Sequence, residues 1–437
     1  MIWNHEAETQ APERRRALQL ERLRDRVRWA AARVPLYRDR LAAAGVSADS
    51  LRGLEDLPRL PFLRKADLRE HYPFGLFAVP RPEVVRLHAS SGTRGKPTVV
   101  GYTRHDLLVW REVMARALAS AGAAPGDLLH VAYGYGLFTG GLGFHDGAEH
   151  MGLTVIPASS GNTLRQILLL RDFRPDGLAC TPSFALHIGD TLPQEGVAPG
   201  ALGLRYGLFG AEPWTEAMRE AIEARLGLRA VDFYGLSEIV GPGVAAECAE
   251  ARDGLHVQED HFLAEEVDPE GRQLPPGTEG ELVLTTLTKE AIPALRYRTG
   301  DLTRLDPGPC RCGRTTARMA RIKGRTDDML IIKGVNVYPS EVEAALLGLA
   351  EVAPHYQLVV DRTRGEFPSL EVQVEVAEPV ATAWGGFESG RPEAASLRAR
   401  VGERLRAVLA LNPEVVLVAP RTLPRSEGKA VRVIERR

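Results

Sequence analysis

The sequence predicts an α/β protein with a large N-terminal domain of mostly parallel sheets and covering helices, followed by a small mobile α+β C-terminal domain. Its 437 residues are 44% hydrophobic, which is enough for more than one sizeable core. Between about 98 and 290, apolar strand-like runs alternate with helical segments, as is typical of α/β architecture. Near residue 325 the pattern changes to short strands and a helix. We therefore expect a large domain over 1–326 and a small domain over 327–437.

The first segment, 13–44, predicts N-terminal helices that cover a larger core. Arg, Ala and Leu recur there at helical spacing. Pro35 ends the first helical run because proline cannot continue a helix from within.

The central region supplies the layers of the large domain. Its strand-like runs include 98–102, 128–133 and 230–234, and its helical segments include 104–121, 164–172 and 213–226. Since strands that alternate with helices usually pair in parallel, we expect largely parallel sheets.

The small domain is predicted from residues after 325. Residues 329–332 and the alternating run 369–376 predict strands, and Pro339 opens a helix from about 340 to 347. Residues 377–395 contain Pro, Gly, Trp384 and few periodic apolar side chains, and they predict an exposed loop.

Charge and cysteine content exclude several classes of protein. The 55 Lys and Arg residues nearly balance 57 Asp and Glu, so no basic field favours nucleic acid or an anionic membrane as a partner. No apolar run has the length of a membrane span, and the N-terminus lacks the layout of a signal peptide. Four cysteines are too few for a disulfide scaffold. We expect a cytoplasmic enzyme.

Residues 90–97 are the most informative segment of the chain. The hydroxyls of Ser90, Ser91 and Thr93 offer hydrogen-bond donors. The glycines Gly92 and Gly95 let backbone N–H groups turn inward, and Lys96 adds a mobile cation. This composition predicts a loop that wraps a polyphosphate, with an ordinary surface turn as the alternative. A Walker A loop is excluded, because only two residues separate the glycines and Pro97 follows the lysine.

Five further segments follow this loop in chain order. The set resembles the adenylate-forming superfamily of acyl-CoA ligases: 209–213, 234–238, 297–301, 324–328 and 425–429. Three others, 133–141, 260–262 and 331–339, resemble the phenylacetate–CoA ligase family within it. The resemblance extends from about Val34 to Arg432. It implies that a carboxylate attacks the α-phosphorus of ATP to give acyl-AMP and pyrophosphate, and that the thiol of coenzyme A then displaces AMP.

The resemblance also implies an ATP site. Lys96 and its loop would hold the β and γ phosphates, and Glu238 would hold Mg²⁺, a cation that favours carboxylate and phosphate oxygens. Asp301 would accept hydrogen bonds from the ribose, and Tyr234 would stack on adenine. The remaining implied members are Gly210, Ala211, Glu212, Pro213, Asp232, Gly235 and Ser237. A surface glutamate, a turn-capping aspartate and a core tyrosine are the ordinary alternatives.

The C-terminal region carries the second catalytic lysine that the resemblance implies. Lys429 would reach the attacking carboxylate and the α-phosphate, and Arg325 would contact the nucleotide. Asp327 would be the hinge about which the small domain rotates to bring Lys333 and Gly334 to the pantetheine arm. The alternatives are a solvated tail lysine and a solvated turn.

Aromatic residues interleaved with glycine predict an apolar slot for an aryl acid. Tyr133, Tyr135 and Phe138 lie near Gly141 in one segment, and Ile239, Val240 and Gly241 form another. Loop packing is the alternative. Phe144 and Arg94 depart from the pattern of related ligases, in which a small residue and a threonine are common. Phe144 would narrow or reshape the slot, and the Arg94 guanidinium would either strengthen phosphate contacts or point to solvent, which leaves the geometry of the loop open.

Cysteines outside this site predict a structural zinc site. Cys310 and Cys312 form a C-x-C-G turn, and Cys248 and His256 lie in the preceding strand-and-loop region. Three thiolates and an imidazole complete a tetrahedral zinc site. Reduced buried cysteines are the alternative, and His261 is the alternative imidazole. Some members of the ligase family carry such a cluster and others lack it.

The predicted function is therefore ATP-dependent ligation of phenylacetate, or a close aryl-acetic acid, to coenzyme A. The expected partners are the carboxylic acid, ATP and CoA, with Mg²⁺ as cofactor, no nucleic acid and no membrane; a homodimer is a candidate assembly. Two alternatives are an enzyme that loads a carrier-protein phosphopantetheine and a non-catalytic nucleotide-binding regulatory protein. The catalytic lysine argues against the second, since a protein that only binds nucleotide has no need of it.

Overall fold

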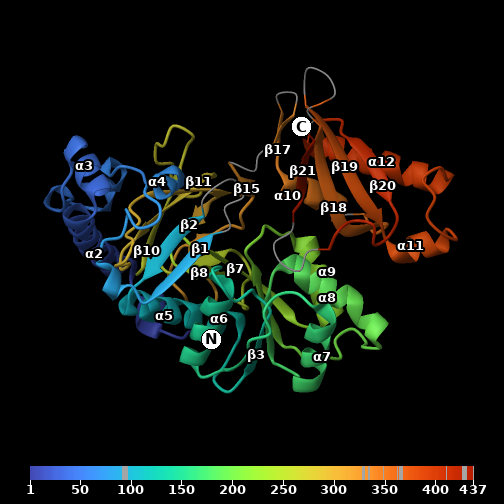
Figure 1. Cartoon of the computed structure of the whole chain (residues 1–437), viewed down its shortest axis with the longest axis horizontal. Helices are drawn as coiled ribbons and strands as arrows, with labels where there is room; N and C mark the ends of the chain where they lie inside the picture. The colour runs from blue at the N-terminus through green and yellow to red at the C-terminus, as the bar shows by residue number, and fades with distance from the viewer. Residues whose placement is uncertain are drawn as a thin grey trace. The chain divides into compact units, whose positions relative to one another are not determined.

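The computed structural model describes the whole chain except residues 91–96, 327–329, 333–334, 348, 362, 364–367, 410, 426–430 and 437. The chain forms two compact units (Figure 1). The first unit contains Met1–Thr181, Gly200–Ala211 and Gly227–Arg321, and the second contains Pro182–Pro199, Glu212–Leu226 and Ile322–Arg437. The predicted domain boundary at 326/327 remains a prediction.

The N-terminal segment is helical, as predicted. Short α1 (His5–Glu8) precedes α2 (Pro12–Arg33) and α3 (Pro35–Ala43), and each of the two longer helices has proline in its first turn. Leu23, Val27 and Ala30 recur at helical spacing and are fully buried, so α2 lies against a core with one face. Shorter helices follow: η1 (Ala48–Ser50), η2 (Leu54–Arg59), α4 (Lys65–Glu70) and η3 (Arg81–Glu83).

The largest sheet has nine strands in the order β13-β14-β9-β8-β7-β6-β5-β3-β4. One half pairs in parallel: β3 (Leu128–Val131), β4 (Thr154–Ile156), β5 (Gly177–Cys180), β6 (Tyr206–Gly210) and β7 (Arg229–Leu236). The other half pairs antiparallel: β8 (Gly241–Glu247), β9 (Leu255–Val257), β13 (Leu305–Asp306) and β14 (Arg318–Met319). The α/β class is confirmed, but the pairing is less parallel than predicted. Only four residues join β7 to β8, too few for the crossover that a parallel pair requires.

Two smaller sheets of the first unit are antiparallel. β1 (Arg86–Ser90) pairs with β2 (Thr98–Tyr102). β10 (Phe262–Val267), β11 (Gly280–Thr286) and β12 (Tyr297–Thr303) pair in sequence order. Three further helices of the first unit are α5 (Arg104–Ala121), α6 (Gly140–Met151) and α7 (Thr163–Phe173). The predicted helical segments 104–121 and 164–172 are therefore confirmed. A capping box between Thr103 and Asp106 starts α5, and Gly122 ends it at φ 103°.

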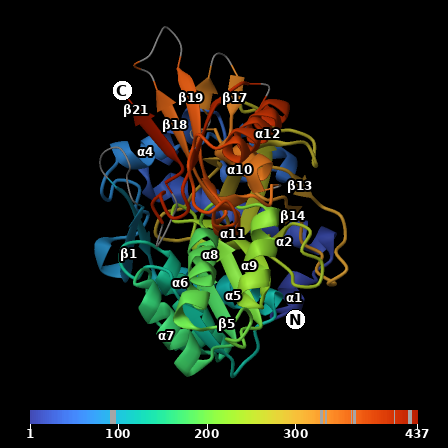
Figure 2. The same cartoon turned by 90° about the vertical axis from the view of Figure 1, so that its right-hand side faces the viewer.

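The second unit is built on the sheet β20-β19-β18-β21. Its helices are α8 (Pro182–Thr191), η4 (Leu192–Glu195), α9 (Glu216–Leu226), α10 (Pro339–Leu347), α11 (Glu378–Ala383) and α12 (Pro392–Leu409). Its strands are β15 (Gly324–Arg325), β16 (Leu330–Ile332), β17 (Val335–Val337), β18 (Val352–Asp361), β19 (Ser369–Val376), β20 (Glu414–Val418) and β21 (Val433–Arg436). Figures 1 and 2 show α10 and α12 beside this sheet, where their apolar faces join its core.

The predicted exposed loop over 377–395 is wrong at residues 378–383 and 392–395, whereas residues 384–391 lie outside helices and strands as expected. The structure places α11 and the first turn of α12 in this segment. Ala381 is buried in the core of the unit, and the partly buried Trp384 and Phe387 pack against it. The helix is too short to show a periodic apolar pattern in the sequence, since packing of a few side chains rather than an amphipathic stripe holds it.

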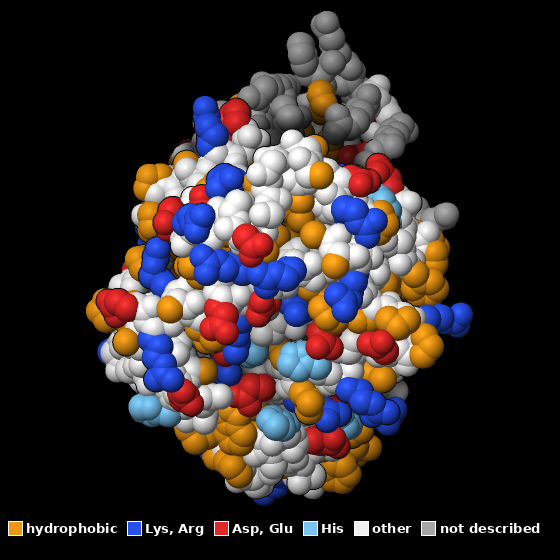
Figure 3. All heavy atoms as spheres, turned by 90° about the vertical axis from the view of Figure 1, so that its left-hand side faces the viewer, with side chains coloured by type: hydrophobic (Ala, Val, Ile, Leu, Met, Phe, Trp, Pro, Cys, Tyr) orange, Lys and Arg blue, Asp and Glu red, His pale blue; other side chains and the backbone are white. Residues whose placement is uncertain are grey.

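The surface carries both signs of charge. Figure 3 shows basic and acidic side chains interspersed over one face. Exposed ion pairs such as those of Arg28 with Asp25 and Asp49 are of this kind. Within the described ranges, no helix has both the length and the apolar character that crossing a membrane requires.

Candidate active site and metal cluster

Several predicted nucleotide-binding residues of the first unit lie at or near the carboxyl ends of the parallel strands β6 and β7, the end at which open α/β sheets bind ligands. Gly210 ends β6, and an added Cβ there would lie 2.4 Å from the carbonyl oxygen of Phe233. Ala211 follows at φ 68°, a left-handed conformation that side chains rarely adopt. The backbone is therefore held in a strained turn at the point where the resemblance places adenine.

Tyr234 and Asp301 come together from separate sheets. The hydroxyl of Tyr234, at the end of β7, donates a hydrogen bond to Oδ2 of Asp301 on β12. Asp301 is 6% exposed, and its backbone N–H donates to Oγ1 of Thr299 at 3.0 Å. The aromatic ring and the carboxylate predicted for adenine and ribose thus occupy one site, although they are 67 positions apart.

Asp232 is buried on β7, two residues before Tyr234. Its backbone N–H donates to Oε2 of Glu247 at 2.9 Å, and Arg321 lies 3.7 Å from its carboxylate. Arg321 also lies 3.7 Å from Glu247. The predicted contact of Asp232 with nucleotide stays a prediction, and the structure places an ion pair at this side chain.

Glu238 lies on the four-residue connection between β7 and β8, residues 237–240, which we call the Glu238 turn. The N–H groups of Ile239 and Val240 both donate to the carbonyl of Leu236. Ser237 contributes its hydroxyl to a hydrogen bond with the hydroxyl of Thr139 at 3.2 Å. The Glu238 side chain is 7% exposed, so its carboxylate is largely withdrawn from water.

Lys289 contacts this turn and was not predicted. Its Nζ donates to the carbonyl of Ile239 at 2.5 Å and to that of Glu238 at 3.3 Å. Burial lowers the pKa of Lys289 to about 8, and the carboxylates of Asp106 and Glu238 act in the opposite direction. No local pattern indicates this lysine, because the two carbonyls that it contacts lie 51 and 50 positions away.

The side chains predicted to line the aryl slot differ in their burial and in their hydrogen-bond partners. The hydroxyl of Tyr133 donates to the carbonyls of Cys180 at 2.5 Å and Gly210 at 3.3 Å, so it links the ends of β5 and β6. Its ring stacks on Phe144 with centroids 5.3 Å apart, and Phe144 is fully buried beside Phe233. Phe144 is therefore a core residue in this structure, the packing alternative left open by the sequence.

The other predicted slot residues lie nearer the surface or in the turn. Tyr135 makes a hydrogen bond with Nδ1 of His145 at 3.2 Å, and Phe138 is 44% exposed. Gly141 is the second residue of α6, where an added Cβ would lie 2.7 Å from the carbonyl of Gly134. Ile239 and Val240 are buried, and Gly241 begins β8 at φ 104°. Their common role in binding an acid stays a prediction.

Several predicted site residues lie outside the described residues: Ser91, Gly92, Thr93, Arg94, Gly95, Lys96, Asp327, Lys333, Gly334 and Lys429. Ser90 pairs with Thr98 across β1 and β2, so these strands bracket the predicted phosphate loop. Glu212, Pro213 and Arg325 belong to the second unit, where Oε1 of Glu212 accepts the N–H of Ser183 at 2.8 Å.

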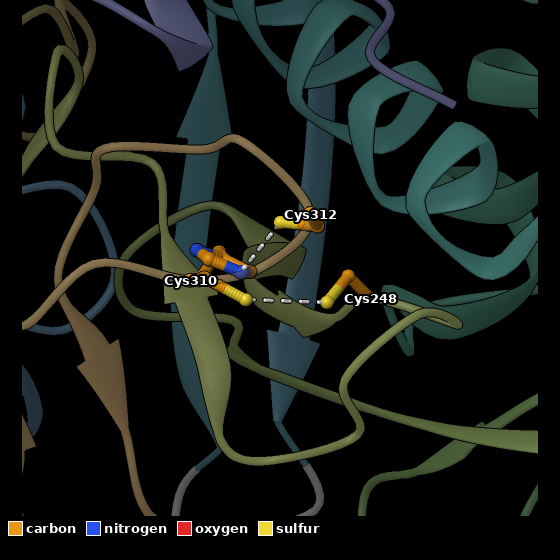
Figure 4. A group of neighbouring side chains, drawn as sticks. Cys248, Cys310 and Cys312 are labelled. Atoms are coloured by element: carbon orange, nitrogen blue, oxygen red, sulfur yellow. Dashed lines mark hydrogen bonds between the residues drawn. The ribbon is translucent and has the colours of Figure 1, made fainter.

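The second cluster consists of Cys248, His256, Cys310 and Cys312, which we call the cysteine cluster. One potential ligand atom from each residue lies within 4.8 Å of those of the others. Cys248 follows β8, His256 lies on β9, and the other two lie on the loop between β13 and β14. Figure 4 shows the cysteines converging, with contacts of 3.7 Å between the Sγ atoms of Cys248 and Cys310 and 3.4 Å between Sγ of Cys312 and Nε2 of His256.

These separations fit a tetrahedral zinc site. A tetrahedron with Zn–S bonds of about 2.3 Å has edges of roughly 3.8 Å, close to the Cys248–Cys310 separation. Nδ1 of His256 contacts the hydroxyl of Thr316 at 3.2 Å, which leaves Nε2 to face the thiols. A hydrogen bond between the thiols of Cys248 and Cys312 lowers the pKa of Cys312 and raises the pKa of Cys248. The donor set therefore fits zinc, with thiol protons to be displaced on binding.

The loop of the cysteine cluster forms an ion pair with the N-terminal segment through Arg314, two residues after Cys312. Nε of Arg314 donates to Oε2 of Glu8 at 2.6 Å, and both side chains are buried. The alternative imidazole, His261, is not part of the cluster: its ring nitrogens contact the hydroxyl of Thr288 at 2.9 Å and the carboxylate of Asp260 at 3.2 Å.

Known proteins share both parts of this chain. The family profile of AMP-binding enzymes matches residues 78–287, and that of the AMP-binding enzyme C-terminal domain matches 334–437. Phenylacetate-coenzyme A ligase of Thermus thermophilus is 54% identical over 439 residues, covering 99% of this chain and 98% of the relative. Phenylacetate-coenzyme A ligase of Escherichia coli is 50% identical over 433 residues, covering 98% and 97%. The crystal structure of 2-hydroxyisobutyryl-CoA ligase with 2-HIB-AMP in the postadenylation state has a TM-score of 0.93 at 32% identity, covering 100% of this chain and 92% of that one.

Proposed function

This chain belongs to the phenylacetate–coenzyme A ligase family of adenylate-forming enzymes, and from that membership we propose that it joins phenylacetate, or a close aryl-acetic acid, to coenzyme A. The reaction consumes ATP, passes through an acyl-adenylate and releases AMP and pyrophosphate. The observation that carries the proposal is the hydrogen bond from Tyr234 to Asp301 near the carboxyl end of the parallel strand β7, directly before the Glu238 turn.

In the adenylation step the chain has to bind ATP and hold the acid in line with the α-phosphorus. Asp301 accepts hydrogen bonds from the ribose hydroxyls, and the ring of Tyr234 stacks on adenine. Glu238 holds Mg²⁺, which neutralises charge on the phosphates when bound. Lys96 and its loop grip the β and γ phosphates, and Lys429 approaches the α-phosphate. Rotation of the small domain about Asp327 then brings the segment of Lys333 and Gly334 to the thiol arm of CoA.

The proposal extends to a structural zinc ion in the cysteine cluster. Three thiolates and one imidazole close the coordination shell, so no position is left for a substrate. The ion would join the end of β8 to the loop between β13 and β14. We also propose a cytoplasmic location and a homodimer, which cell fractionation and light scattering of the purified protein test.

Pyrophosphate exchange into ATP tests the proposed acid. We expect exchange with phenylacetate and hydroxyphenylacetates to exceed exchange with benzoates and medium-chain fatty acids, and addition of CoA to give AMP and the thioester. Exchange with fatty acids alone would contradict the proposed aryl-acetic acid substrate but would be consistent with the adenylation mechanism. AMP release with a phosphopantetheinyl carrier protein but not with CoA would contradict the acceptor. Binding of ATP without any exchange would favour the regulatory alternative.

A further inference from the structure

Lys289 occupies an unusual place in the first unit. It lies on the connection between β11 and β12 and is 5% exposed. Its ammonium donates to two successive backbone carbonyls, those of Glu238 and Ile239, and lies 5.1 Å from the centroid of the Tyr102 ring. Carbonyl oxygens and a ring face both attract a cation, so the site compensates in part for the water that the ammonium has lost.

The rest of the Glu238 turn is held in the same manner. The hydroxyl of Tyr102 donates to the carbonyl of Val240 at 3.0 Å, and Nε1 of Trp110 donates to that of Pro242 at 2.9 Å. The rings of Tyr102 and Trp110 stack with centroids 5.0 Å apart. Side-chain donors therefore hold the carbonyls of residues 238, 239, 240 and 242. These contacts engage the backbone of Glu238 and not its carboxylate.

Lys289 is itself fixed in place. The carboxylate of Asp106 accepts the N–H groups of Glu290 at 2.7 Å and Ala291 at 3.0 Å, the two residues after the lysine. The hydroxyl of Thr103 donates to Glu290 at 2.8 Å, and Arg26 donates to the carbonyl of Lys289 at 3.1 Å. The start of α5 and the helix α2 thus hold the segment from which the ammonium reaches the turn.

Composition adds an independent observation. The sequence contains 49 arginines but only six lysines, at positions 65, 96, 289, 323, 333 and 429. Arginine therefore supplies nearly every cation of this chain. A lysine has a compact ammonium on a flexible stem, whereas the planar guanidinium of arginine needs more room. A lysine in a closed site of this chain thus indicates that the compact head matters there.

We propose that Lys289 is a positioning residue for adenylation, which fixes the backbone of Glu238 and Ile239 so that the Glu238 carboxylate keeps its place. This inference rests on the proposed function, since it takes Glu238 as the ligand of Mg²⁺. The lysine acts through the turn and touches neither the nucleotide nor the acid.

Three substitutions test this role. Lys289→Met keeps the length and removes the donor, Lys289→Gln keeps one donor group, and Lys289→Arg keeps the charge but enlarges the head. We expect Lys289→Met to lower kcat/KM for Mg·ATP in phenylacetate-dependent pyrophosphate exchange about 10- to 100-fold, because misplaced groups lose alignment with the phosphates. Thioester formation from preformed phenylacetyl-adenylate and CoA should stay within about 3-fold, since that step no longer needs the metal-bound triphosphate.

Lys289→Gln should recover part of the loss, whereas Lys289→Arg should not. The control Lys65→Met makes the same change at a partly exposed lysine at the start of α4 and should match the wild type. If Lys289→Met does not fold, the ratio of the two half-reactions in Lys289→Gln decides.

Unchanged exchange in folded Lys289→Met, or equal loss in both half-reactions, would overturn the positioning role. Failure of the proposed function looks different, because the wild type itself would then show no exchange with phenylacetate. If the wild type used another acid and Lys289→Met still lost exchange selectively, the positioning role would stand and the substrate would be wrong.

Discussion

The Glu238 turn and the cysteine cluster are both buried in the first unit, yet they are held in opposite ways. In the turn, protein donors such as Lys289 and Tyr102 bind backbone carbonyls, so the backbone groups find their partners within the chain. In the cysteine cluster, the potential ligand atoms of the side chains face one another at 3.4 to 3.7 Å. The protein alone can organise the turn, whereas the proposed zinc ion would complete the cluster and add to its stability.

The protein itself organises the first site, whereas the proposed zinc ion would complete the second. A substitution in the Glu238 turn should lower the rate of adenylation while the protein still folds. Damage to the cluster should alter the fold while the chemistry of the surviving protein remains. Each experiment below separates these two kinds of effect.

The largest effect is expected from Cys310→Ser. Loss of one thiolate opens the shell, so zinc content should fall from one ion per chain to nearly none, and the thermal midpoint should drop by about 10 °C. Metal analysis and thermal unfolding measure both, and removal of metal from the wild type by a chelator should give the same shift. Cys180→Ser changes a buried cysteine of β5 outside the cluster and should keep the ion. A metal-free wild type with the same midpoint would refute the structural role.

Glu238→Gln should produce the next largest effect. The amide keeps the shape of the side chain but not the charge that is proposed to hold Mg²⁺, so adenylation should slow about 100- to 1000-fold. Pyrophosphate exchange measures the loss, and the unfolding midpoint should stay within a few degrees of the wild type. The control Glu83→Gln alters an exposed carboxylate in η3. Nearly normal exchange in Glu238→Gln would show that Glu238 is not part of the adenylation site.

The smallest effect is expected from Tyr102→Phe. The change removes one hydroxyl, that bound to the carbonyl of Val240, and leaves the ring stacked on Trp110. It should cost about 1 kcal/mol of stability and lower exchange less than about 5-fold. Tyr37→Phe is the matched control, because its hydroxyl binds the carbonyl of Pro293 elsewhere in the unit. If Tyr102→Phe lowered exchange as much as Lys289→Met does, any hydrogen-bond donor to the turn would have the same effect. The positive charge of Lys289 would then have no special role.

The parts of the fold that were predictable are those with local signals. Helix α5 extends over the predicted residues because a capping box and a glycine mark its ends. The cysteine cluster was found from the spacing of few, chemically distinctive residues. The short helix α11 was missed because it contains too few apolar residues for a period to appear.

The site was predictable where a motif carries it and not where long-range contacts do. Tyr234 and Asp301 were named from separate motifs, and the structure brings them together. Lys289 was missed because its two acceptors lie about 50 positions away and only tertiary packing reveals them. The burial of Phe144 between Tyr133 and Phe233 likewise depends on contacts that no local pattern contains.

The four-residue length of the Glu238 turn limits how this site can change. β7 and β8 pair with Leu236 opposite Gly241, and an added Cβ at Gly235 would lie 2.0 Å from the carbonyl of Gly241. Inserting or deleting one residue in the turn would shift the register of β8, and its side chains would exchange faces of the sheet. Variants with a new choice of acid should therefore arise by substitution along the turn and not by altering its length.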